Sequence, residues 1–124
     1  MKPTERGFAH MRLATQYSYR GIRSAWRNEE SFRQEVLVVM VGLPLAVWLA
    51  RDTVDFLLLA LPLLLLMCAE LANSAIEATV DRVSEEYHEL SGRAKDMGSA
   101  AVFMAITIVI LSWTTVCLSI FYFN

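Results

Sequence analysis

Four polar side chains recur along an apolar stretch at a spacing that places them on one side of a helix. They are Glu70, Asn73, Glu77 and Asp81, at positions i, i+3, i+7 and i+11, and such positions lie on a common helical face. A charged side chain at the centre of a membrane costs about 2.5 to 3.5 kcal/mol on insertion scales, so we expect this face to serve a function. The other interpretation is a polar seam that only joins helices.

Carboxylates at this spacing could bind a divalent cation. Mg²⁺ is usually held by one or two carboxylates together with phosphate oxygens of a substrate, and Glu70 and Glu77 have the amide of Asn73 between them. Acids before the first apolar block could complete such a site from another helix: Glu29, Glu30 and Glu35. Many surface helices carry acids like these, so the pattern is only moderately specific.

The segment of residues 85–99 is dense in the residue types that bind phosphates and metals. It includes His88, Lys95 and Asp96, and charged groups of this kind form strong hydrogen bonds with phosphate. The other interpretation is a solvated loop. The motifs GxxxxGK[ST], GxGxxG, HExxH and CxxC do not occur in the sequence, so soluble nucleotide and metal sites have no support.

The elements that must position these residues are membrane helices. Of the 124 residues 56% are hydrophobic and 19% are charged, which excludes disordered, collagen-like and disulfide-scaffold proteins. Three apolar blocks, residues 36–50, 56–76 and 97–124, are too long for buried strands. The second and third reach the ~20 residues that cross a bilayer, whereas the first crosses only if its ends reach the interfaces.

The connections between the blocks predict their arrangement. Residues 51–55 leave room only for a tight turn, so the first two spans should form an antiparallel hairpin. Lysines and arginines number seven in the first 35 residues, one in residues 51–55 and three in residues 81–96, which predicts a cytoplasmic N terminus and a C terminus on the other side. Residues 8–26 mix apolar and basic side chains at spacings of three and four, as in amphipathic helices on membrane surfaces.

Several strings of residues resemble the signature of the prokaryotic diacylglycerol kinase family, the small integral-membrane lipid kinases of Gram-negative bacteria. The strings are Ala25-Trp26 with Asn28-Glu29, Phe32-Arg33-Gln34-Glu35, the run from Glu70 to Arg82, and the run from Glu86 to Ala101. The resemblance implies an all-α membrane protein with three transmembrane helices plus an N-terminal amphipathic surface helix, assembled as a homotrimeric bundle. It implies a single domain, residues 1–124, with the surface helix at about 5–28 and spans at about 33–50, 54–80 and 97–121.

The resemblance also implies an activity. This is ATP-dependent phosphorylation of diacylglycerol to phosphatidic acid at the cytoplasmic face of the inner membrane, with Mg²⁺ as cofactor and ATP as co-substrate. Membrane lipid and further copies of the chain would be its partners, and nucleic acid would not. Glu70 corresponds to the general base that takes the proton from the lipid's primary hydroxyl, and Asn73, also expected to be catalytic, corresponds to a residue positioned beside the Mg²⁺ ligands. Glu29 and Glu77 correspond to the Mg²⁺ ligands around ATP.

The remaining correspondences concern the two substrates. The other nucleotide contacts would be His10, Tyr17, Glu86, Tyr87, His88, Lys95 and Asp96. The lipid contacts would be Ala14, Tyr19, Arg23, Trp26, Ser31, Glu35, Trp48, Arg51, Phe56, Glu70, Ser99, Trp113 and Leu118. The sequence departs from the family at His10, where the family has an arginine. Either His10 donates the phosphate hydrogen bond instead, or Arg12 does.

Two other functions fit parts of the pattern. A kinase that phosphorylates undecaprenol belongs to the same superfamily and would share the polar face. A small proton-coupled membrane transporter would use the intramembrane glutamate to carry a proton, although such transporters usually have an even number of spans. Phosphoryl transfer agrees with the residues present, because it asks a protein mainly for positioning and for neutralisation of charge.

Overall fold

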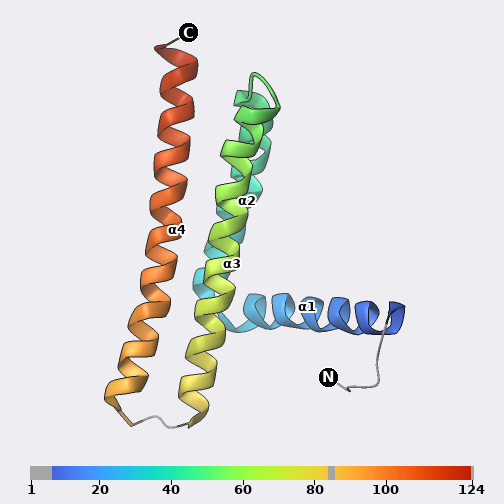
Figure 1. Ribbon diagram of the computed structural model, residues 1–124, viewed down its shortest axis with the longest axis vertical. Coiled ribbons are helices and arrows are strands. Elements are labelled where there is room, and N and C mark those ends of the chain that lie inside the picture. Colours follow the sequence, from blue (N-terminus) through green and yellow to red (C-terminus); the bar gives the residue numbers. More distant parts are fainter. Residues whose placement is uncertain (1–6, 84–85, 124) are drawn as a thin grey trace.

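Four helices make up the described part of the chain. The computed structural model describes residues 7–83 and 86–123. The helices are α1 (Phe8–Asn28), α2 (Glu30–Leu49), α3 (Thr53–Val83) and α4 (Glu89–Phe121). Figure 1 shows α2, α3 and α4 running along one axis, with α1 lying crosswise to them. The expected start of the first helix at residue 5 lies outside the described residues.

Three of these helices are long and apolar enough to cross a membrane. They are α2, α3 and α4, so the predicted number of apolar helices of membrane-spanning length is confirmed. Pro44 and Pro62 lie inside α2 and α3 without ending either helix, as neighbouring groups in a membrane protein can satisfy a freed carbonyl. Large apolar side chains stay exposed along all three helices, including Leu37, Leu57 and Phe103, and such surfaces suit contact with lipid or with other helices.

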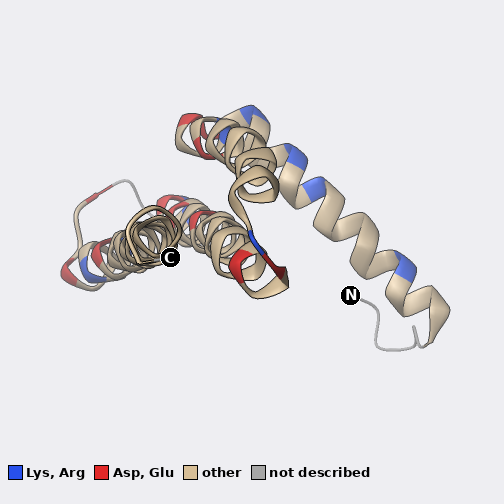
Figure 2. Cartoon of the chain, turned by 90° about the horizontal axis from the view of Figure 1, so that it is seen from above, with Lys and Arg blue, Asp and Glu red and all other residues tan. Residues whose placement is uncertain are grey.

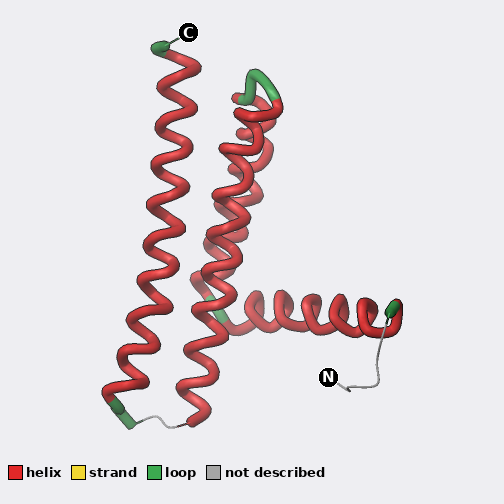
Figure 3. The backbone as a smooth tube through the Cα atoms, in the orientation of Figure 1, coloured by secondary structure: helices red, strands yellow, loops and turns green. Residues whose placement is uncertain are grey.

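A single residue separates α1 from α2. Glu29 has extended backbone angles, φ −119° and ψ 109°, and Figure 3 shows the chain turning there between two helices. Arg33 stabilises the corner, because its Nη1 donates to the carbonyl oxygens of Trp26 at 2.8 Å and Arg27 at 3.4 Å. Basic side chains commonly satisfy the last carbonyls of a helix in this way. The corner therefore holds Glu29 at the junction of the two helices.

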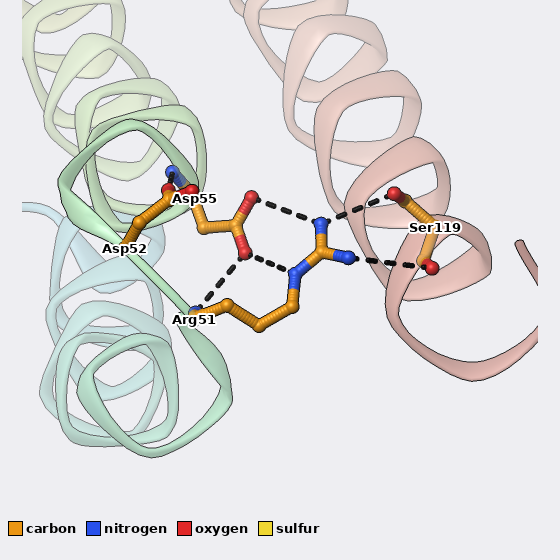
Figure 4. Close-up of polar contacts among 4 residues, drawn as sticks. All are labelled: Arg51, Asp52, Asp55 and Ser119. Carbon is orange, nitrogen blue, oxygen red and sulfur yellow. Dashed lines mark hydrogen bonds and ion pairs between the residues drawn. The ribbon is translucent and has the colours of Figure 1, made fainter. Parts of the chain in front are cut away.

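The predicted hairpin of the first two spans is confirmed. Only residues 50–52 separate α2 from α3, and the Asp52 carboxylate accepts a hydrogen bond from the Asp55 backbone N–H at 2.9 Å, which caps the start of α3. Arg51 joins this turn to α4 (Figure 4): its Nε lies 2.7 Å from Asp55 Oδ2 and its Nη2 lies 3.1 Å from Ser119 Oγ. These polar contacts connect the α2–α3 turn with α3 and α4 at one end of the bundle.

A cluster of buried apolar side chains lies in the same half of the bundle. Ala46, Leu59 and Val116, one from each spanning helix, are buried together. Beside them, Trp113 Nε1 donates to the Leu59 carbonyl oxygen at 2.9 Å and Ser112 donates to that of Leu58. The opposite half of α3, toward the α3–α4 connection, carries three further buried polar residues, Glu70, Asn73 and Ser74.

Candidate active site

The polar face of α3 is buried at its centre and emerges toward the end of the helix. Glu70, Asn73 and Ser74 are exposed by only 5%, 9% and 8%, although two of them are amide or carboxyl groups. Glu77 is half-buried and Asp81 is exposed. The expectation that the stripe faces other helices is confirmed for Glu70 and Asn73, and the gradient leads from the interior to the α3–α4 connection.

The carboxyl groups of Glu70 and Glu35 meet across the α2–α3 contact. They lie close enough to interact, and Glu35 is itself half-buried on α2, with its Oε2 buried and without a hydrogen-bond partner in the described part of the chain. Two carboxylates this close repel each other. A proton shared between them would remove that repulsion.

Two further acids surround this pair. Glu29 from the α1–α2 corner and Glu77 from α3 are both close enough for their charges to act on Glu70. Glu77 also acts on Lys95 of α4, so it lies between the buried carboxyl pair and the α3–α4 connection. Four acids that are up to 48 residues apart in the sequence, Glu29 to Glu77, thus gather in one region.

The acids fit a magnesium ion that a substrate shares, and do not form a complete protein cage. Among residues 7–83 and 86–123, no group of three His, Cys, Asp or Glu side chains is arranged to hold a metal ion. Mg²⁺ needs only one or two protein carboxylates when phosphate oxygens and waters supply the rest. Glu29, at the α1–α2 corner, and Glu77, on α3, could provide such a pair, because both lie close enough for their charges to act on Glu70.

A groove between α1 and α3 opens beside this region. Its volume is about 590 Å³, within the range of ~300 to 1,000 Å³ typical of ligand sites. Small residues such as Gly21, Ala25 and Ala75 line it, and Glu29 and Ser74 lie at its polar part. Ser74 Oγ is buried and finds no hydrogen-bond partner in the described part of the chain. Ser74 does not stand out in the sequence pattern, although its place next to Asn73 is a signal that points to it.

A smaller pocket of about 190 Å³ lies at the α3–α4 connection. Its lining includes four of the expected nucleotide contacts together with Asp81: Glu86, Tyr87, His88 and Lys95. His88 Nδ1 accepts a hydrogen bond from the Leu90 backbone N–H at 3.1 Å and so caps α4. Since α4 begins at Glu89, Lys95, Asp96 and Ser99 are helical, and the solvated-loop interpretation is wrong for them.

The charges of α1 differ in kind from those of the bundle. Figure 2 shows basic residues along α1 and acids on the other helices, and α1 itself contains Arg12, Arg20, Arg23 and Arg27 but no acid. Tyr19 and Arg23 line a shallow groove of about 480 Å³ on this helix. Two aromatic side chains expected to contact substrates, Tyr17 and Trp26, are about half exposed.

Several expected site residues lie far from Glu70 within one chain. Phe56 is on the same helix, about 21 Å away at 1.5 Å per residue, at the end fastened by Arg51. Others belong to that same end of the bundle: Trp48, Trp113 and Leu118. His10 lies near the start of α1 and Ala14 follows one turn later. The single chain does not bring these residues to the acidic region, and their roles stay predictions.

Known proteins match this chain over most of its length. The family model described as prokaryotic diacylglycerol kinase matches residues 16–117, a range that contains all four acids but not His10. A protein named diacylglycerol kinase from Escherichia coli strain K12 is 50% identical over 107 residues, 86% of this chain and 88% of the relative. Relatives of the same name are 47% identical in Pseudomonas aeruginosa, over 90% of this chain and 91% of that protein, and 45% identical in Haemophilus influenzae, over 86% and 91%.

Proposed function

Because this chain belongs to the prokaryotic diacylglycerol kinase family, we propose that it transfers the γ-phosphate of ATP to diacylglycerol, giving phosphatidic acid at the cytoplasmic face of the inner membrane. The observation that carries the proposal is the buried Glu70 carboxyl, paired with Glu35 and approached by Glu29 and Glu77. A carboxyl group inside a membrane helix is costly, and accepting the proton of a lipid hydroxyl is a task for which a carboxylate there is suited.

Glu70 acts as the general base in this proposal. It accepts the proton of the lipid's primary hydroxyl as that oxygen attacks the γ-phosphorus, the bond from phosphorus to the bridging oxygen breaks, and ADP leaves. Glu35, close enough to interact with Glu70, shares the proton that Glu70 has accepted. Asn73, one turn further along α3 and buried beside the base, orients the reacting groups. A positioned base typically accelerates such a step by about 10²- to 10⁴-fold.

Glu29 and Glu77 hold the nucleotide through magnesium. When bound, Mg²⁺ neutralises the charge of the phosphate oxygens. The two carboxylates orient the triphosphate toward Glu70, because both lie close enough for their charges to act on Glu70. Lys95 and the pocket at the α3–α4 connection bind the remainder of ATP, a role supported by the charge of Glu77 acting on Lys95.

The substrates meet at the cytoplasmic interface. We place α1 on the membrane surface with its arginines toward lipid headgroups, and the α3–α4 connection on the same side. Figure 1 supports this arrangement, since α1 lies toward the end of the bundle that carries this connection. The acceptor enters from the bilayer and ATP from the cytoplasm. One chain has too few helices to enclose both, so we propose a homotrimer in which the exposed apolar faces of the spans pack together.

The decisive experiment compares two acceptors. Purified protein in detergent receives Mg²⁺ and γ-labelled ATP with diacylglycerol or with undecaprenol, and the lipid products are separated. We expect label in phosphatidic acid, and a strong loss of it in Glu70→Gln but not in Glu30→Gln, which removes an exposed acid of α2. Label only in undecaprenyl phosphate would reassign the acceptor, and label in neither lipid would refute a kinase of lipid alcohols.

A further inference from the structure

Gly98 of α4 packs directly against the amide of Asn73. Gly98 is buried, and a β-carbon built on it would lie 2.3 Å from Asn73 Oδ1 and 3.5 Å from Ile76 Cδ1. The amide oxygen therefore occupies the space that any other residue at position 98 would fill. What meets this glycine is a polar side chain of the candidate site, rather than the backbone of α3.

The amide oxygen gains no hydrogen bond from this position. Asn73 Oδ1 is buried and has no hydrogen-bond partner within residues 7–83 and 86–123. Burial of an unpaired amide oxygen costs free energy, so stability alone does not explain the arrangement. The close contact of this oxygen with Gly98 is therefore one of shape, not of hydrogen bonding.

Gly42 offers a comparison within the same chain. A β-carbon at Gly42 of α2 would lie 2.7 Å from Leu63 Cδ1 of α3, so both glycines admit the end of an α3 side chain. Small residues often let membrane helices approach closely, and Gly42 serves that purpose with an apolar neighbour. The two sites differ in what a substitution would displace, a methyl group at Gly42 and the Asn73 amide at Gly98.

We propose that Gly98 is a positioning residue for phosphoryl transfer, which acts by leaving room for the Asn73 amide in its reactive orientation beside Glu70. The inference rests on the proposed function, because that function places Asn73 in the reaction. An alanine at position 98 would force the amide to rotate or shift, since the end of a side chain moves more easily than a packed helix. A displacement of about 1 Å in a reacting group can cost about a hundredfold in rate.

The test is a double-mutant cycle of Gly98→Ala, Asn73→Ala and the double variant. For each protein, kcat and the KM values for ATP and diacylglycerol are measured. We expect Gly98→Ala to lower kcat by about tenfold or more, with both KM values within about threefold of wild type and the thermal midpoint close to that of Gly42→Ala. In the Asn73→Ala background the same Gly98→Ala change should cost almost nothing further, because the displaced amide is gone. Gly42→Ala should keep the wild-type kcat.

Other outcomes overturn the inference in recognisable ways. Normal turnover in Gly98→Ala, or a loss that simply adds to that of Asn73→Ala, would show that Gly98 does not act through the amide. Failure of Gly98→Ala to fold, measured by its oligomeric state and thermal melting, would make the glycine structural. A wild type that phosphorylates neither lipid would refute the proposed function itself, whereas an active wild type with impaired Asn73→Ala and normal Gly98→Ala refutes only this inference.

Discussion

Lys95 Nζ lies 2.6 Å from Asp81 Oδ1, so an ion pair joins α4 to the end of α3 at the edge of the small pocket. Both side chains are about half exposed, at 43% and 58%, and exposed pairs contribute little to stability. The contact is therefore better placed to orient Lys95 than to hold the helices together.

Asp81→Asn tests this role. We expect the free energy of unfolding to change by less than about 1 kcal/mol, while the KM for ATP rises several-fold because Lys95 loses its fixed position. The matched control is Glu89→Gln, an exposed acid that is not among the residues lining the pocket. Equal ATP affinity in both variants would show that the ion pair between Asp81 and Lys95 does not contribute to nucleotide binding.

Glu70→Gln tests the general base. The amide keeps nearly the shape of the carboxyl but cannot accept the proton, so kcat should fall by about 10²- to 10⁴-fold. ATP affinity, measured by direct binding, should stay near that of wild type. Turnover within a few-fold of wild type would place the base elsewhere.

Glu29→Gln and Glu77→Gln test the magnesium ligands. Loss of one carboxylate weakens coordination without removing the base, so each variant should need more Mg²⁺ for half-maximal activity and recover turnover at high Mg²⁺. Magnesium titrations at fixed ATP measure this. If both titrations overlay the wild-type curve, the metal is bound by other groups.

His10→Arg tests the departure from the family. Arginine binds phosphate through a planar, bidentate guanidinium, so the variant should lower the KM for ATP, by at most about tenfold for an exposed contact. Wild type and variant are compared at identical Mg²⁺. An unchanged KM, together with a large loss of ATP affinity in Arg12→Ala, would assign the contact to Arg12.

Asp55→Asn tests the contact at the other end of the bundle. Hydrogen bonds from the Arg51 guanidinium to Asp55 raise the pKa of Arg51 above its usual value. A raised pKa of a basic group stabilises the fold at every pH below the pKa of that group in the unfolded chain. This stabilisation is therefore present throughout the accessible pH range. Asp55→Asn should lower the thermal midpoint more than Ser119→Ala, because Ser119→Ala leaves the ion pair between Arg51 and Asp55 intact. Equal melting of both variants would show that the carboxylate adds nothing.

Much of the fold was predictable because its signals are local. Apolar length alone indicated the three spans, the five residues after Ala50 indicated the hairpin, and helical periodicity put Glu70 and Asn73 on one face. The start of α4 at Glu89 was less visible, because charged residues fit a loop and a helix equally well until His88 is seen to cap the helix.

By itself the sequence determined the spans, their order and the polar face of α3, since each depends on residues within a few turns of one another. Only the tertiary structure decided which groups meet: Glu35 with Glu70, Asp81 with Lys95, Asn73 with Gly98, and Arg51 with Ser119, 68 residues away. The rotation and axial offset of one helix against another arise from many packing contacts summed along their length, and no single spacing in the sequence encodes them.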